Sequence, residues 1–211
     1  MLKTRIRFIK QGRARFISHL DLMGVFQRAF VRAKLPVKYT EGFNPHIYIS
    51  IAMPMPTGYE GECEIADTEL TIAQLPRDFI QRLNAVLPEG LLATDVYLCG
   101  GDAKNIAFVQ YHATVLGECL PKREECYENL SVRPVMLTKR SKNGERTVDL
   151  WDSLHSCFID DISGGYALNL IMMAGEGKLN PEYAVNYLFG VRGERLYRRV
   201  GVLDSELCSF R

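Results

Sequence analysis

The order of two hydrophobic patterns over the first hundred residues constrains the fold of this chain more than any other feature. Residues 3–9 alternate between apolar and basic side chains, which is typical of a strand with one buried face. A helix is expected next, because apolar residues recur at helical spacing from Leu22 to Ala33. Ser18 and Asp21 precede this stripe with the spacing of a capping box, which marks the start of the helix.

The rest of the first half continues in the same manner. Pro76 opens a second helical pattern, and strand patterns occupy residues 37–40, 47–52, 62–72 and 91–98. Apart from the short strand at 37–40, the order of the main elements is strand, helix, strand, strand, helix, strand. This order is typical of the ferredoxin-like, or split βαβ, arrangement.

The second half repeats this order less regularly. Its elements are two helical and several strand patterns: strands at 108–116, 166–174 and 195–203, helices at 121–130 and from Pro181 to Phe189, and a hairpin turning at Lys142-Asn143-Gly144. We therefore predict an α+β chain of two tandem ferredoxin-like halves, 1–100 and 101–211, with a boundary near Gly100-Gly101.

Composition excludes several classes of protein. The 211 residues are 47% hydrophobic and 24% charged, as in globular proteins. No apolar run approaches the roughly 20 residues that span a bilayer, and the first residues lack the apolar core of a signal peptide, so we expect a cytoplasmic protein. The six cysteines include no CxxC pair. We therefore expect reduced thiols, no metal site and no cofactor.

Charge is distributed very unevenly along the chain. Residues 1–46 hold ten Lys and Arg against two acidic residues, a net charge of +8, whereas residues 47–211 carry −7. Such an asymmetry favours an anionic partner at the N-terminal end, and RNA is the first candidate.

The candidate binding residues all lie in this basic block. We expect the strand arginines on the open face of the sheet, aromatic residues beside them for stacking on bases, and the start of the helix as a phosphate site. The predicted substrate-binding residues are Arg5, Arg7, Arg13, Arg15, Ser18, His19, Asp21, Phe43, Asn44 and His46.

Plainer interpretations stand beside this one. Basic residues on a strand are usually solvated, Asp21 can serve only as a helix cap, and Phe43 can fill the core. A catalytic alternative pairs His19 with His46 as acid and base of a metal-independent RNA endonuclease, with Arg13 or Arg15 as the cation. A third hypothesis is a protein–protein adaptor, in which the basic block docks on an acidic partner.

Two segments carry a family resemblance, RFISHLD at residues 15–21 and GFNPH at 42–46. Over residues 3–70 the chain closely resembles the radical-SAM-linked protein family, a bacterial domain of unknown function found beside, or fused to, radical SAM proteins. The resemblance implies a radical SAM partner and an accessory role, because the chain lacks the CxxxCxxC triad of the partner enzymes. The leading hypothesis is a non-catalytic accessory module that binds RNA, with no catalytic residue of its own.

Overall fold

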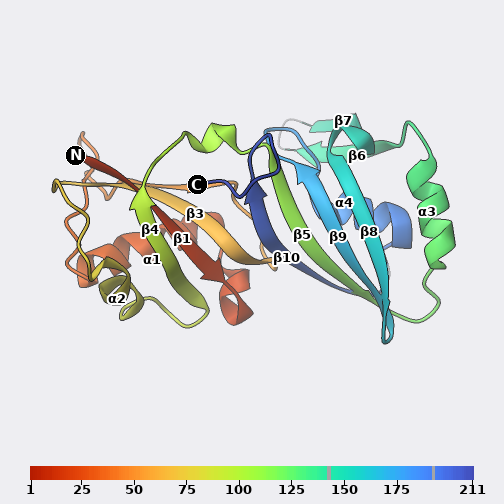
Figure 1. Ribbon diagram of the computed structural model, residues 1–211, viewed down its shortest axis with the longest axis horizontal. Helices are drawn as coiled ribbons and strands as arrows, with labels where there is room; N and C mark the ends of the chain where they lie inside the picture. Colours follow the sequence, from red (N-terminus) through yellow and green to blue (C-terminus); the bar gives the residue numbers. More distant parts are fainter. Residues whose placement is uncertain (142–143, 192) are drawn as a thin grey trace. The chain divides into compact units, whose positions relative to one another are not determined.

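The computed structural model describes residues 1–141, 144–191 and 193–211 (Figure 1). The chain forms two compact units: unit 1 is Met1–Ala103 together with Arg211, and unit 2 is Lys104–Phe210. Both units combine helices with antiparallel strands, so the chain has an α+β fold. None of the helices in the described ranges is long and apolar enough to cross a membrane.

Unit 1 has the predicted order of main elements. They are β1 (Leu2–Lys10), α1 (His19–Arg32), β2 (Ile49–Ala52), β3 (Glu60–Leu70), α2 (Phe79–Asn84) and β4 (Leu91–Leu98), with a 3-10 turn at Gly12–Phe16. The antiparallel strands lie in the order β4-β1-β3-β2. Residues 37–40 do not form the expected strand, because only two isolated bridges form there, Val37 with Leu70 and Tyr39 with Ile47.

The two helices of unit 1 pack on the same face of this sheet. Ile6 and Phe8 of β1 are completely buried against Phe26 of α1 and Phe79 of α2. The rings of Phe8 and Phe26 meet edge to face with centroids 4.9 Å apart. The apolar half of the alternation in residues 3–9 is therefore buried as predicted, and its side chains form part of the core.

Unit 2 contains more strands than the sequence patterns predict. Its elements are β5 (Phe108–Leu116), α3 (Arg123–Ser131), β6 (Met136–Ser141), β7 (Gly144–Asp149), β8 (Leu154–Ile162), β9 (Gly165–Met173), α4 (Pro181–Phe189) and β10 (Glu194–Leu203), with 3-10 turns at Ala103–Asn105 and Leu150–Asp152. Four strands form an antiparallel sheet in the order β10-β5-β9-β8. The strand β8 was not predicted.

The hairpin of unit 2 stands apart from this sheet. β6 pairs with β7 alone, from Met136 opposite Asp149 to Ser141 opposite Gly144. The predicted turn residues Lys142 and Asn143 lie outside the described residues. Two basic side chains of the hairpin form internal hydrogen bonds: Lys139 donates to the carbonyl of Lys178 at 2.6 Å, and Arg146 donates to that of Gly177.

Candidate nucleic-acid interface

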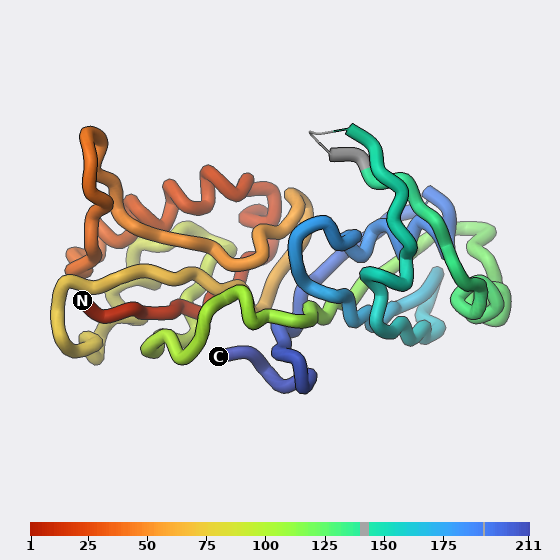
Figure 2. Tube along the Cα trace, turned by 90° about the horizontal axis from the view of Figure 1, so that it is seen from above, coloured from red at the N-terminus to blue at the C-terminus, as the bar shows by residue number. Residues whose placement is uncertain are grey.

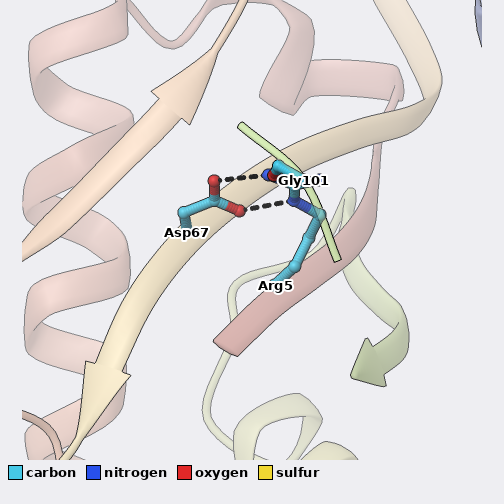
Figure 3. A network of polar contacts seen from close by, with 3 residues as sticks. All are labelled: Arg5, Asp67 and Gly101. Carbon is cyan, nitrogen blue, oxygen red and sulfur yellow. Dashed lines mark hydrogen bonds and ion pairs between the residues drawn. The ribbon is translucent and has the colours of Figure 1, made fainter. Parts of the chain in front are cut away.

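Arg5 does not line an open surface. Its side chain is 1% exposed and donates two hydrogen bonds to the carboxylate of Asp67, at 2.7 and 2.8 Å (Figure 3). A third bond, at 2.9 Å, reaches the carbonyl of Gly101. The sheet face opposite the helices is thus covered at this point by the segment that follows β4. The structure therefore does not place Arg5 on the open surface that we expected, because the side chain is buried and bonds to Asp67 and the backbone.

Arg7 lies on the same side of β1 and is half-buried. Burial raises the pKa of the neighbouring Tyr97, while the positive charges of Arg7 and Arg5 lower it. Arg7 therefore lies beside Tyr97 on this side of the sheet and is only partly accessible.

The turn before α1 presents two arginines in different settings. Arg13 is exposed, whereas the guanidinium of Arg15 lies 4.8 Å from the ring centroid of Phe16, with Nη1 4.0 Å from Oε1 of Glu60. Contacts of this kind at a surface stabilise little but restrict where the side chain points.

The predicted start of α1 is confirmed, and Ser18 caps it with a hydrogen bond from the backbone, although the reciprocal bond of a capping box is replaced by one between the two side chains. The hydroxyl of Ser18 accepts from the backbone N–H of Asp21 at 3.2 Å and donates to its carboxylate at 2.6 Å. Both side chains are thus engaged at the start of the helix, which agrees with the alternative that Asp21 serves only the helix cap. A carboxylate at this terminus also opposes a phosphate there.

His19 adjoins a small cavity that contains two buried charged residues. Besides His19, its lining includes Lys10 and Glu64, each 2% exposed. Nζ of Lys10 donates to the carbonyl of Ile17 at 2.9 Å, which fastens the end of β1 to the chain just before α1. Sequence reasoning missed both residues, although a lysine ending an alternating strand is a signal for such a tether.

The loop 40–46 is a closed, strand-like structure. The N–H of Thr40 donates to the carbonyl of His46 at 2.7 Å, and the N–H of His46 donates to Oγ1 of Thr40 at 3.1 Å. Nδ1 of His46 lies 3.2 Å from the carbonyl of Asn44, whose side chain is exposed. Figure 2 shows this segment projecting away from the rest of unit 1. Phe43 is fully exposed, which excludes the alternative that it fills the core.

The loop leans on α1 and forms a pocket with it, which we call the α1 pocket. Nε2 of Gln27 donates to the carbonyl of Ile47 at 3.0 Å and holds the end of the loop against the helix. The pocket has a volume of about 430 Å³. Its lining residues are Gln27, Arg28, Val31, Arg32, Tyr39, His46 and Ile47.

The α1 pocket assembles cations that the predicted site did not include. Arg28 and Arg32 are exposed, one helical turn apart, and so share a face of α1. Among the residues that line the pocket, none is acidic. The sequence did contain one signal of this surface, since the two arginines are four residues apart and lie off the apolar stripe of the helix. That Tyr39 and His46 line the same pocket could not be predicted, because it depends on the path of the loop.

The two histidines of the catalytic alternative lie at different places. His19 is the first residue of α1, whereas His46 shares its pocket with Val31 near the other end. A helix rises 1.5 Å per residue, so His19 and Val31 are about 18 Å apart along the axis. His19 and His46 therefore do not share either of these pockets, and the acid–base pair has no geometric support.

The described residues contain no cluster of three or more His, Cys, Asp or Glu side chains that could hold a metal ion. All six cysteines are free. In Cys99, Cys126 and Cys157, burial raises the pKa of the thiol, which reaches about 12 for Cys157. High thiol pKa values argue against these three as nucleophiles.

Comparison with known proteins places the chain in a family. No curated protein matches its sequence. Its fold is similar to that of a chain in the crystal structure of a Cbf5-Nop10-Gar1 complex, with a TM-score of 0.51, 10% identity, and coverage of 93% of this chain and 47% of that one. The chain thus spans about half the length of that neighbour, and at this identity the likeness shows the fold alone. A family model matches residues 3–181, so the chain belongs to DUF2344, a family of uncharacterized proteins conserved in bacteria.

Proposed function

We propose that this protein is a non-catalytic module that binds RNA through the α1 pocket and the neighbouring loop 40–46. The observation that carries the proposal is the meeting of Arg28 and Arg32 with the exposed ring of Tyr39 in one pocket of about 430 Å³. Basic side chains that follow a phosphate backbone and aromatic rings that stack on bases are the two parts of a general RNA-binding surface.

This location modifies the binding site expected from the sequence. His46, Asn44 and Phe43 remain in the proposed interface, because all three are exposed on the loop. Arg28 and Arg32 replace Arg5 as its main cations. Arg13 and Arg15 are separate surface charges at the other end of α1, where they can attract RNA over longer distances.

An accessory role beside a radical SAM enzyme is part of the proposal and depends on the family resemblance. The tandem ferredoxin-like description is also retained as a proposal. The strand orders β4-β1-β3-β2 and β10-β5-β9-β8 support it, since each places the first strand of its unit in the middle of the sheet. Sheets of this kind occur in RNA-binding domains, although a fold does not establish a function.

A salt titration with paired variants tests the RNA proposal. Filter binding of cellular tRNA and rRNA fragments should show micromolar affinity that falls steeply with salt, because each neutralised phosphate releases counterions. Replacing both Arg28 and Arg32 by glutamine should weaken binding and reduce the slope of log Kd against log salt by about 1.4, or about 0.7 per lost phosphate contact on a single strand.

The matched control replaces two exposed cations that do not line the pocket, Arg77→Gln with Lys122→Gln, and so changes the net charge equally. An equal loss in the control would place RNA binding outside the α1 pocket. If the wild-type protein shows no salt-sensitive binding at micromolar concentration, the RNA proposal fails. Capture of a protein that survives nuclease treatment would then favour the adaptor hypothesis.

A further inference from the structure

We infer that the α1 pocket receives the base of an unpaired nucleotide, so that the RNA bound there is single-stranded. The inference rests on the proposed function and names the class of RNA that this surface selects. It follows from the shape and chemistry of the pocket and of the loop beside it.

The wall of the pocket is apolar and accessible. Val31 is 56% exposed and Tyr39 is 52% exposed, while Ile47 is buried below them. An aromatic ring beside aliphatic side chains suits the flat face of a base, and every base has such a face. A phosphate group alone would gain nothing from this wall, so the pocket favours a ligand with an apolar part.

The rim on the helix side is cationic, and each of its two arginines has a contact that limits where its side chain points. Nη1 of Arg28 lies 3.3 Å from where a Cβ would stand on Gly24, so the guanidinium lies back along the helix surface. Nη2 of Arg32 donates to the carbonyl of Val86 at 2.8 Å. A guanidinium has five N–H donors, and this single bond leaves Arg32 with the capacity to bind a phosphate. A base in the pocket would thus have its backbone along the arginines.

Phe43 supplies a second aromatic surface outside the pocket. It lies in a loop that the bonds between Thr40 and His46 close, and next to Gly42, whose φ of 122° favours glycine. The ring of Phe43 is fully exposed on this loop and is therefore accessible for stacking on a base. Because Tyr39 and Phe43 are separate surfaces, the ligand needs at least two bases and is an oligonucleotide.

A duplex does not meet these requirements. In a duplex the faces of the bases are stacked on one another, and the edges of the bases lie in the grooves. Only the phosphates of a duplex could therefore reach Arg28 and Arg32. An unpaired segment can turn its bases outward onto Tyr39 and Phe43. The same protein should therefore bind loops and single strands more tightly than helical stems.

Fluorescence anisotropy with three labelled probes tests this inference. The probes are a ten-nucleotide oligoadenylate, the same strand in a duplex with oligouridylate, and a labelled heparin fragment as a polyanion without bases. The single strand should bind the wild-type protein at least about fivefold more tightly than the duplex, since one stacked base changes Kd by about 5- to 150-fold. Phe43→Ala and Tyr39→Ala should each weaken single-strand binding by at least about fivefold.

The aromatic variants separate stacking from charge. Tyr39→Phe keeps the ring and should bind as the wild type does, and both alanine variants should bind heparin as the wild type does. If single strand and duplex bind equally and the alanine variants change neither, stacking is excluded while RNA binding through Arg28 and Arg32 stands. If neither RNA binds at all, both the inference and the proposed function fail. A thermal unfolding curve for each variant verifies that it folds.

Discussion

Arg5 and Asp67 occupy directly opposite positions on β1 and β3, and the guanidinium of one holds the carboxylate of the other in a two-bonded ion pair. The hydrogen bonding that Arg5 donates to Asp67 is the main reason that the pKa of Arg5 is raised. Arg5 also anchors the chain after β4 through Gly101. We therefore assign Arg5 a structural role in the sheet.

Removal of Arg5 should therefore destabilise the protein without altering RNA binding. Arg5→Ala leaves Asp67 without this partner in a largely enclosed place, and breaking a buried pair costs about 3–5 kcal/mol. Urea unfolding should show a loss of at least about 2 kcal/mol after allowing for the partial exposure of Asp67. Arg13→Ala, at an exposed site, should change the free energy of unfolding by no more than about 0.5 kcal/mol. A near-neutral Arg5→Ala would contradict the role assigned to the pair.

The cap at Ser18 gives a smaller and more specific prediction. Ser18→Ala removes the acceptor for the N–H of Asp21 and should lower the free energy of unfolding by about 1 kcal/mol. Ser18→Gly should lower it by only a few tenths, because glycine at this position leaves the first N–H groups open to water. Chemical denaturation of both variants measures the difference, and equal losses would show that the hydroxyl does not act as a cap.

Lys10 should be a structural residue despite its charge. Lys10→Met removes the bond to the carbonyl of Ile17 and one charge from the cavity that Glu64 also lines. We expect a loss of about 2 kcal/mol or more, because buried polar groups that lose partners are costly. Lys3→Met, at an exposed residue of the same strand, is the matched control for the loss of a positive charge. Calorimetry would compare the two; an unchanged transition for Lys10→Met would argue against the tether.

The cysteines should differ sharply in their reaction with iodoacetamide. The thiolate is the reactive form, and burial raises the pKa of the Cys126 and Cys157 thiols, to about 12 for Cys157. Cys119 and Cys208 are exposed. At pH 8, peptide mass spectrometry should therefore find Cys119 and Cys208 modified first and Cys157 last. Early modification of Cys157 in the folded protein would contradict its burial.

Alkaline pH should unfold the protein partly through Tyr197. Burial raises the pKa of this phenol from 10 to about 12 in the folded chain, so folding favours its neutral form. The stabilisation is complete below pH 10 and is lost as pH rises from 10 towards 12. Between these values the free energy of unfolding should fall more steeply for the wild type than for Tyr197→Phe, which has no phenol to ionise. Parallel urea titrations at pH 9 and pH 11 measure the difference.

Local patterns were sufficient where one segment carries its own signals. The apolar stripe and the Ser18 cap located α1, and a proline at the first turn located α4 at Pro181–Phe189. β8 was missed because Asp160 and Asp161 interrupt its hydrophobic pattern, so that its pairing with β9 determines its structure.

The site depended more strongly on contacts distant in the sequence. Nothing in the sequence near Arg5 indicates that Asp67 will lie opposite it. The strand face was therefore expected to be exposed at Arg5, where the side chain is in fact buried. Arg28 and Arg32 likewise become part of a pocket only because Tyr39 and His46 lie beside α1 in the folded chain. The charge excess of residues 1–46 indicated the region that the proposed binding site now occupies. It could not separate cations that stabilise the fold from cations on its surface.

The bond between Arg5 and Gly101 has a consequence for how this unit can evolve. The sheet face of unit 1 that the helices leave bare is crossed at this point by the main chain after β4, and Arg5 in the first strand holds that main chain through the carbonyl of Gly101. Under the proposed function, recognition would belong to α1 and the projecting loop 40–46, whose surface residues can be exchanged one by one while the strands beneath keep their partners.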